Sequence, residues 1–240
     1  MKKVLFTAAL FSACTFVMAQ EAAPAASSEY KPTAGANNLE LNFVPLNGKP
    51  IQLTYIRYRK FLTASTALRL GVGLSIASTS NDTARASNVT PGTTINTTSK
   101  TSKFGWNIKP GFEKHFAGTE RLSPYVGAEL DLAGQTAKEV NASIDSKDAA
   151  ISTTTKNKSK GGFMRVVAGV LAGFDCYITK HLYLGTEFGF GFQMVKYSKL
   201  KTTYSPAPVS PAKQPDDVDQ GKEFNLGPNF NSAIRLGFIF

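Results

Sequence analysis

The sequence predicts an all-β fold: an eight-stranded antiparallel up-and-down transmembrane β-barrel with short periplasmic turns and long extracellular loops. Three observations support this prediction. Apolar and polar residues alternate with period two in repeated segments, and no helical period is sustained. The connections between these segments are alternately short and long. One face of the segments is almost uncharged, whereas the other carries most of the glycines and a balanced set of charges.

The start of the sequence predicts an export signal. Lys2 and Lys3 form a basic start, an apolar stretch follows, and Ala19 ends a small-residue cleavage pattern, so residues 1–19 are predicted to be a signal peptide. Two alternatives are a lipoprotein signal ending at Cys14 and a buried N-terminal helix. Residues 20–38 are rich in Ala and Pro and are expected to form a flexible periplasmic lead-in to a transmembrane β-barrel at residues 39–240.

Composition excludes several classes of protein. No run of eighteen apolar residues is present, which argues against membrane-spanning helices. A hydrophobic content of 42% with 17 Phe argues against a disordered chain. Cleavage after Ala19 leaves Cys176 as the single cysteine, so no intrachain disulfide is expected. A closed barrel offers an exported protein another source of stability.

The predicted strands follow in order from the alternation. The first is short and precedes Pro45, and the second changes phase near Tyr55 and Ile56, which predicts a β-bulge there. The last strand has the clearest alternation and ends at Phe240. The eight predicted strands are residues 39–43, 51–60, 68–76, 104–116, 125–132, 164–178, 182–196 and 224–240.

The connections predict two distinct ends of the molecule. The short ones are residues 61–65, 117–122 and 179–181, and the long polar ones are residues 77–101, 133–160 and 197–223. The remaining connection, residues 47–50, is a tight turn on the side of the long loops. Short turns at one end and long loops at the other are typical of outer-membrane barrels.

The polar face favours a lumen over a water-exposed surface. Glycine weakens an exposed strand, but inside a narrow barrel it leaves room for long side chains from opposite strands. Six basic and six acidic residues on this face balance, as a buried interior requires. A soluble barrel is the alternative, but lysine and arginine are nearly absent from the apolar face, where lipid would make each cost about 2–4 kcal/mol. The predicted structural charge network is Glu40, Arg57, Arg59, Arg69, Lys109, Glu113, Glu129, Asp131, Arg165, Asp175, Glu187 and Arg235.

The strand pattern and the C-terminus resemble a known family. The eight alternating strands resemble small OmpA/OmpX-type barrels, and Asn38–Phe43 with the Ala/Pro-rich start is similar to the Bacteroidetes outer membrane protein β-barrel family. This resemblance implies a protein of the Gram-negative cell outer membrane. The alternate apolar residues before the terminal Phe resemble the β-signal that the barrel-assembly machinery reads; they are Ile234, Leu236, Phe238 and Phe240.

The sequence offers little for catalysis. His115 and His181 both lie at short turns, away from outer-leaflet lipid, and neither has an evident hydroxyl nucleophile beside it. No metal cluster or nucleotide-binding loop is found, so no enzyme, cofactor or metal is expected. The charges are expected to form salt bridges in an interior without a wide pore. A narrow channel is the first alternative, and a lipid-modifying enzyme is the second.

The long loops are the remaining candidates for function, through an extracellular ligand. The expected partners are otherwise outer-membrane lipid, lipopolysaccharide and the assembly machinery, and the chain is expected to be a monomer. The net charge of +10 becomes about +8 without Lys2 and Lys3. Because the predicted interior sums to zero and the remaining excess is spread out, no nucleic acid is expected.

Overall fold

A computed structural model describes residues 29–43, 51–87, 91–145, 153–158, 160–205 and 216–240. The predicted signal peptide and the turn at 47–50 therefore lie outside the described residues. All regular elements are strands, and no helix among the described residues is long and apolar enough to cross a bilayer. The strands are β1 (Asn37–Phe43), β2 (Ile51–Thr63), β3 (Thr66–Ala86), β4 (Thr94–His115), β5 (Leu122–Asp145), β6 (Thr153–Lys158), β7 (Phe163–Tyr177), β8 (Leu182–Tyr197), β9 (Lys201–Ser205) and β10 (Lys222–Ile239).

Eight of the strands close into a ring. The pairing runs β4-β3-β2-β1-β10-β8-β7-β5, and β5 pairs again with β4, all antiparallel. Pairing of β1 with β10 joins the two ends of the chain, with Leu39 opposite Phe238 and Phe43 opposite Ile234. These are the eight strands that the alternation predicts. Strand β1 begins at Asn37, so the predicted lead-in ends two residues earlier than expected.

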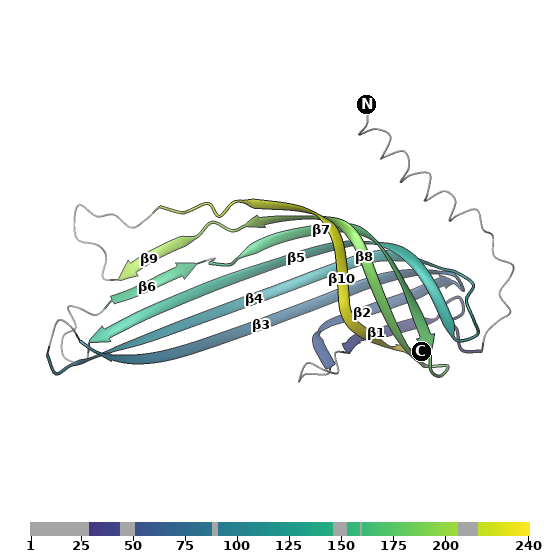
Figure 1. Ribbon diagram of the computed structural model, residues 1–240, viewed down its shortest axis with the longest axis horizontal. Coiled ribbons are helices and arrows are strands. Elements are labelled where there is room, and N and C mark those ends of the chain that lie inside the picture. The colour runs from purple at the N-terminus through teal and green to yellow at the C-terminus, as the bar shows by residue number, and fades with distance from the viewer. Residues whose placement is uncertain (1–28, 44–50, 88–90, 146–152, 159, 206–215) are drawn as a thin grey trace, which may run out of the picture.

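The predicted long loops are wrong over much of their length, because they continue the strands. Strand β3 runs on to Ala86 and β4 starts at Thr94, so most of residues 77–101 is a hairpin. Likewise β5 and β6 occupy much of 133–160, and β9 and the start of β10 lie within 197–223. Figure 1 shows these strands reaching far beyond the ring on the side away from the C-terminus. We name the outer parts of these strands the extension: β3 from Ser78 onward, β4 up to Ser102, β5 from Lys138 onward, and the whole of β6 and β9.

The residues of the extension favour extended backbone, although they do not form an apolar face. Threonine is β-branched and favours extended backbone, and Thr residues recur in both β4 and β6. The inner part of β5 pairs with β7 and its outer part pairs with β6. The chain is interrupted between β6 and β7, where Gly161 has a φ of 81°. The Gln135 amide donates to the Gly161 carbonyl at 2.7 Å and fixes this break.

The predicted phase change in β2 is present but lies before Tyr55. Leu41 pairs with Ile56, whereas the next residue, Asn42, pairs with Gln52, so the register shifts across residues 53–55 of β2. Tyr55 therefore shares the inward face with Arg57. Its phenol accepts a hydrogen bond from the Arg57 Nε at 3.3 Å.

Burial in the ring is inverted relative to a soluble protein. The outward residues of β3 are apolar and exposed, up to 61% for Leu74 and 83% for Ile76. The inward residues include charged side chains that are almost wholly buried, such as Arg59 and Glu113. Outward apolar side chains continue around β4, β8 and β10, including Phe104, Phe190 and Phe238.

The end of the ring that carries the short turns is closed by aromatic side chains. Tyr177, Tyr183 and Ile239 form a buried cluster, and Tyr30 packs against it from the segment before β1. The Arg121 guanidinium lies over the Tyr30 ring at 3.9 Å. This chain segment thus covers the closed end of the ring.

Candidate functional site

The candidate site is the charged interior of the ring. At its centre, Arg59 from β2 contacts carboxylates from three other strands. Its Nη1 lies 2.8 Å from Glu113, and its Nη2 lies 2.7 Å from Asp175 and 2.8 Å from Glu40. Arg235 from β10 also bridges Glu40 and Asp175, at 2.9 and 3.0 Å. The ion pairs therefore join strands across the ring as well as neighbours.

A second layer of ion pairs lies next to this centre. Arg57 joins Glu40 at 3.0 Å to Glu187 at 2.8 Å. Arg69 contacts Glu113 at 2.7 Å, Glu129 at 2.9 Å and Glu187 at 3.1 Å. Four arginines and five carboxylates thus form one connected network. Breaking such a buried arrangement leaves a charge uncompensated, which typically costs about 3–5 kcal/mol.

The other predicted charges form a smaller and wetter cluster. Asp131 lies 2.8 Å from Arg165 and 3.4 Å from Lys109. The side chains of Arg165 and Lys109 are 31% and 24% exposed. The structure therefore places all twelve predicted residues in ion pairs, but in two groups with different access to water. Each of the eight ring strands contributes at least one of these residues.

Tyrosines belong to the network and are absent from the predicted set. The Tyr183 hydroxyl donates to Glu40 at 2.6 Å and accepts from Arg59 at 2.7 Å. The Tyr125 hydroxyl donates to Glu187 at 3.0 Å and accepts from Arg235 at 2.6 Å. Each phenol links an arginine to a carboxylate. Each tyrosine lies on the same face of its strand as a charged residue, as Tyr183 does with Glu187 on β8. This shared face was the signal in the sequence for both tyrosines.

The inward glycines make room for these tyrosines. A Cβ at Gly237 would lie 2.0 Å from the Tyr183 ring, and one at Gly173 would lie 2.5 Å from the Tyr125 hydroxyl. Both tyrosines come from the adjacent strand, directly opposite the glycine in register. The sequence predicted that side chains from strands on the far side of the ring would fill the space above the glycines, and this prediction is wrong at these two positions. Gly185 fits that expectation no better, because Arg235 from neighbouring β10 fills its space.

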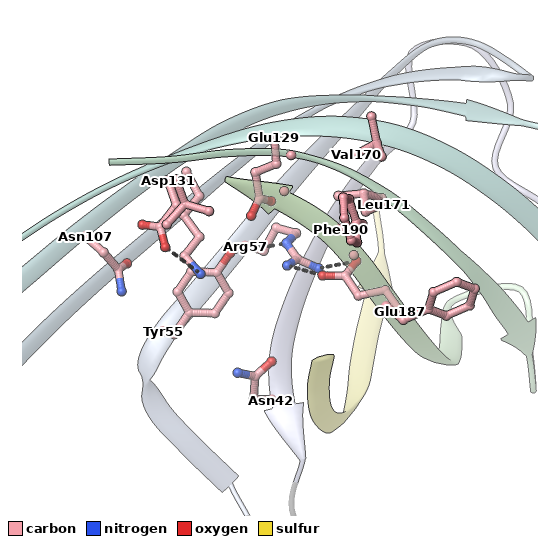
Figure 2. A pocket seen from close by; sticks show the side chains of 16 residues that line it. Asn42, Tyr55, Arg57, Asn107, Glu129, Asp131, Val170, Leu171, Glu187 and Phe190 are labelled. Carbon is pink, nitrogen blue, oxygen red and sulfur yellow. Dashed lines mark hydrogen bonds and ion pairs between the residues drawn. The ribbon is translucent and has the colours of Figure 1, made fainter. Parts of the chain in front are cut away.

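Two cavities lie between the ion-pair network and the extension. The larger, about 300 Å³, is lined by Tyr55, Asn107 and charged residues from both groups: Arg57, Lys109, Glu129, Asp131 and Glu187. Figure 2 shows Arg57 and Glu187 facing each other along it, with Asp131 farther along and Asn42 below. The second, about 210 Å³, shares Tyr55 and Asn107 and includes Arg165 and Gln135. The larger cavity is lined by charges of both signs, so it has no strong preference for anions or cations, whereas Arg165 is the one charged residue among the described residues that line the second.

The histidines require one correction. The Ser123 hydroxyl lies 3.0 Å from His115 Nδ1, and His115 Nε2 lies 3.3 Å from Glu113, an arrangement that sequence reasoning missed. All three side chains are buried, and neither described cavity is lined by them. Glu113 is also engaged by two arginines, so this contact connects β4 and β5 at the closed end. His181 instead contacts the Ile239 carbonyl through Nδ1 at 3.0 Å.

The site holds charged side chains in fixed positions and has few reactive groups. Within the part of the chain that the structure describes, no cluster of three or more His, Cys, Asp or Glu residues is arranged to hold a metal ion. Cys176 is a free cysteine that points outward and is exposed. A filled, ion-paired interior stabilises a closed ring and limits passage through it.

The predicted C-terminal signal residues lie on the outward face of β10. Ile234, Phe238 and Phe240 are exposed, and Leu236 is half-buried. The Phe238 ring stacks between His181 and Phe240, with centroid distances of 5.9 and 6.4 Å. These side chains occupy the outer surface at the seam where β10 meets β1.

Comparison with known proteins identifies a family. No curated protein matches the chain. A family model described as the putative OmpA-OmpF-like porin family matches residues 51–209, which is about two thirds of the chain and includes eight of the ten described strands entirely. This family suggests a porin-like β protein of the outer membrane. The chain, with its ring of eight antiparallel strands, belongs to the putative OmpA-OmpF-like porin family.

Proposed function

We propose that the ring spans the outer membrane as a β-barrel closed by its own ion pairs, and that it serves to hold the extension at the cell surface. The extension then provides the surface for interactions outside the cell. The observation that carries this proposal is the inverted burial of the ring, with apolar residues outward and ion pairs inward. Lipid is the solvent in which such an outward face is stable.

The shape of the outward face supports a membrane span. Exposed apolar side chains on β3 run from Leu68 to Ile76 and end at Ser78, where the extension begins. On β4 they run from Phe112 to Phe104 and end at Ser102, which pairs with Ser78. Nine strand residues cover about 26 Å at 3.3 Å for each step. A transmembrane β-strand tilted by about 45° needs about 9–11 residues to cross the hydrocarbon core, so nine residues are enough for a span.

The orientation is tested by labelling cysteines on intact cells. In a Cys176→Ser background, Ala84→Cys is in the extension and Ala117→Cys is beside a short turn; both positions are exposed. A membrane-impermeant maleimide should label Ala84→Cys on intact cells and Ala117→Cys only after permeabilisation. The opposite pattern, or equal labelling of both cysteines on intact cells, would overturn the proposed orientation.

A narrow channel is a second candidate function, favoured by the two cavities. They bring water-accessible space from the extension down to Arg57 and Glu187. Below that level, the ion pairs of Arg59 and the Tyr177–Tyr183 cluster fill the ring. Conduction therefore requires that part of the network rearrange.

Planar-bilayer recording separates the two candidates. A closed barrel gives no steady conductance. A channel gives a steady conductance that Arg69→Gln or Glu129→Gln changes, because Glu129 lines the larger cavity and Arg69 contacts Glu129 at 2.9 Å. Steady conductance that responds to these variants would replace the closed-barrel proposal with the channel.

A further inference from the structure

Three lysines lie directly opposite one another on the extension. Lys138 of β5 pairs in register with Lys158 of β6, and Lys158 pairs in register with Lys201 of β9. We name these three residues the lysine row. All three are exposed. Figure 1 shows β5, β6 and β9 together in the extension, next to the ring.

The lysine row lies on the outward face, immediately beyond the apolar band. Lys138 pairs with Ser102, and two positions nearer the ring Thr136 pairs with the exposed Phe104. Because β4 and β5 pair without a shift over this stretch, Lys138 points to the same side as Phe104. In the proposed orientation, the row is therefore at the level of the headgroups of the outer leaflet.

The row has no described counter-charge of its own. Like charges directly opposite on a sheet destabilise the pairing. Among the residues that the structure describes, none of the three lysines forms an ion pair. Asp217 and Asp219 flank Val218, which pairs with Leu200 beside the row, but Asp219 accepts instead from the Gly221 backbone at 2.9 Å.

The inward face of the same strands shows the contrast. Glu139, next to Lys138 but facing inward, pairs with Lys160 at 2.9 Å and accepts from Asn141 at 2.8 Å. The hydrogen bond from the Lys160 ammonium holds the pKa of the Glu139 carboxyl below its ordinary value. The extension thus neutralises a charge on its inward face and leaves three cations together on its outward face. Two further exposed lysines, Lys100 and Lys156, lie on the outward face in the next row.

We propose that the lysine row binds the phosphate groups of anionic glycolipid in the outer leaflet. This inference rests on the proposed function, since it needs the apolar band to be embedded in lipid. A phosphorylated headgroup beside the barrel supplies the negative charge that the row lacks, while its acyl chains contact the apolar band below. The row then fixes the height of the barrel and anchors the extension against the membrane surface.

The test measures lipid binding by native mass spectrometry in neutral detergent. The probes are diphosphoryl lipid A, fully dephosphorylated lipid A and inorganic phosphate. The variant changes Lys138, Lys158 and Lys201 to Gln. The matched control changes Lys60, Lys103 and Lys114 to Gln, which removes the same charge at the other end of the ring and on the inward face. A third variant places Arg at the three row positions.

The wild type should bind diphosphoryl lipid A at least about tenfold more tightly than the dephosphorylated lipid, because lysines beside an anionic headgroup are attracted to its charge. The Gln variant should lose this difference, and the control and Arg variants should keep it. Equal binding by the Gln variant and the wild type would overturn the proposal. Displacement of the lipid by equimolar inorganic phosphate would overturn the lipid as the ligand.

Membrane insertion is measured separately on the same proteins, through quenching of Trp106 by brominated lipid. A quenched protein whose lipid A binding does not depend on the row refutes the lysine proposal alone. A wild type that is not quenched refutes the proposed membrane span and the lysine proposal with it.

Discussion

Arg59 shows most directly how single residues stabilise the ring. It is fully buried and its guanidinium contacts three carboxylates from β1, β4 and β7. Arg165 has the same functional group, but it is 31% exposed and shares one carboxylate with Lys109. Desolvation, and not the presence of an ion pair, should therefore decide the consequence of losing either arginine.

Arg59→Met should destabilise the folded protein by about 3–5 kcal/mol, because Glu40, Glu113 and Asp175 lose a shared cation in a buried interior. Arg165→Met is the matched control and should cost less than about 1 kcal/mol. Urea unfolding in detergent micelles, followed by tyrosine and tryptophan fluorescence, measures both. Similar losses for the two variants would contradict the division of the charges into a buried network and a wetter cluster.

Two glycines of β10 differ in what their missing side chain permits. The Tyr183 ring occupies the space above Gly237, whereas the nearest atom to a Cβ at Gly227 is 3.9 Å away. Gly237→Ala should therefore destabilise the protein by about 1–3 kcal/mol through overpacking, and it should disturb the hydrogen bond from Tyr183 to Glu40. Gly227→Ala on the same strand should be close to neutral. Unfolding midpoints of the two variants check this, and equal midpoints would refute the close packing of Tyr183 on glycine.

The sequence predicted the charged residues of the interior well, but it missed the phenols. Parity along a strand determines the face of a side chain, so alternation placed all twelve charges on one face. It placed Tyr183 there too, but a tyrosine is compatible with lipid, with water and with a buried network. Only the register of β8 on β10, which sets Tyr183 opposite Gly237, shows that this phenol lies over a glycine and reaches Glu40.

At the scale of elements, the ring strands were predictable and the extension was not. Ring strands such as β8 and β10 have one apolar face, which makes their period visible in the sequence. The outer part of β4, from Thr94 to Ser102, has polar residues on both faces except at Ile95, so the sequence predicts a loop there. Its strand structure depends on pairing with both β3 and β5, which local sequence does not encode.

The C-terminal strand provides a prediction about assembly. The side chain of Phe240 is exposed at the outward seam and stacks on Phe238 at 6.4 Å, while its backbone exchanges hydrogen bonds with Asn37 that Ala would keep, so the folded ring depends little on the phenyl ring. Phe240→Ala should lower the folded fraction in cells several-fold if the resemblance to a β-signal reflects recognition by the assembly machinery. Refolding of the same variant into detergent in vitro should match the wild type.

Heat-modifiable gel migration measures the folded fraction in both settings. Phe224 lies too far from the terminus to belong to the signal, yet it is also exposed and stacks on one ring, that of Phe192, so Phe224→Ala is the matched control. A folded fraction in cells that is normal for Phe240→Ala, or a refolding defect as large as the defect in cells, would argue against a recognition role for Phe240.

For the whole molecule, the central claim is that the ring has lipid outside and ion pairs inside. The chain contains a single tryptophan, Trp106, which makes this claim directly measurable. Trp106 lies on the outward face of β4 between Leu74 and Gly134, whereas its neighbour Asn107 faces the interior cavities. The two positions are adjacent in sequence but should be in different solvents.

The most direct test is fluorescence quenching in vesicles of brominated phosphatidylcholine. The account predicts strong quenching of Trp106 relative to vesicles of the unbrominated lipid. A Trp106→Phe, Asn107→Trp variant moves the fluorophore to the inward face and should be quenched much less. Strong quenching at position 107 with little at 106, or no quenching at either, would contradict the assignment of lipid to the outer face of the ring.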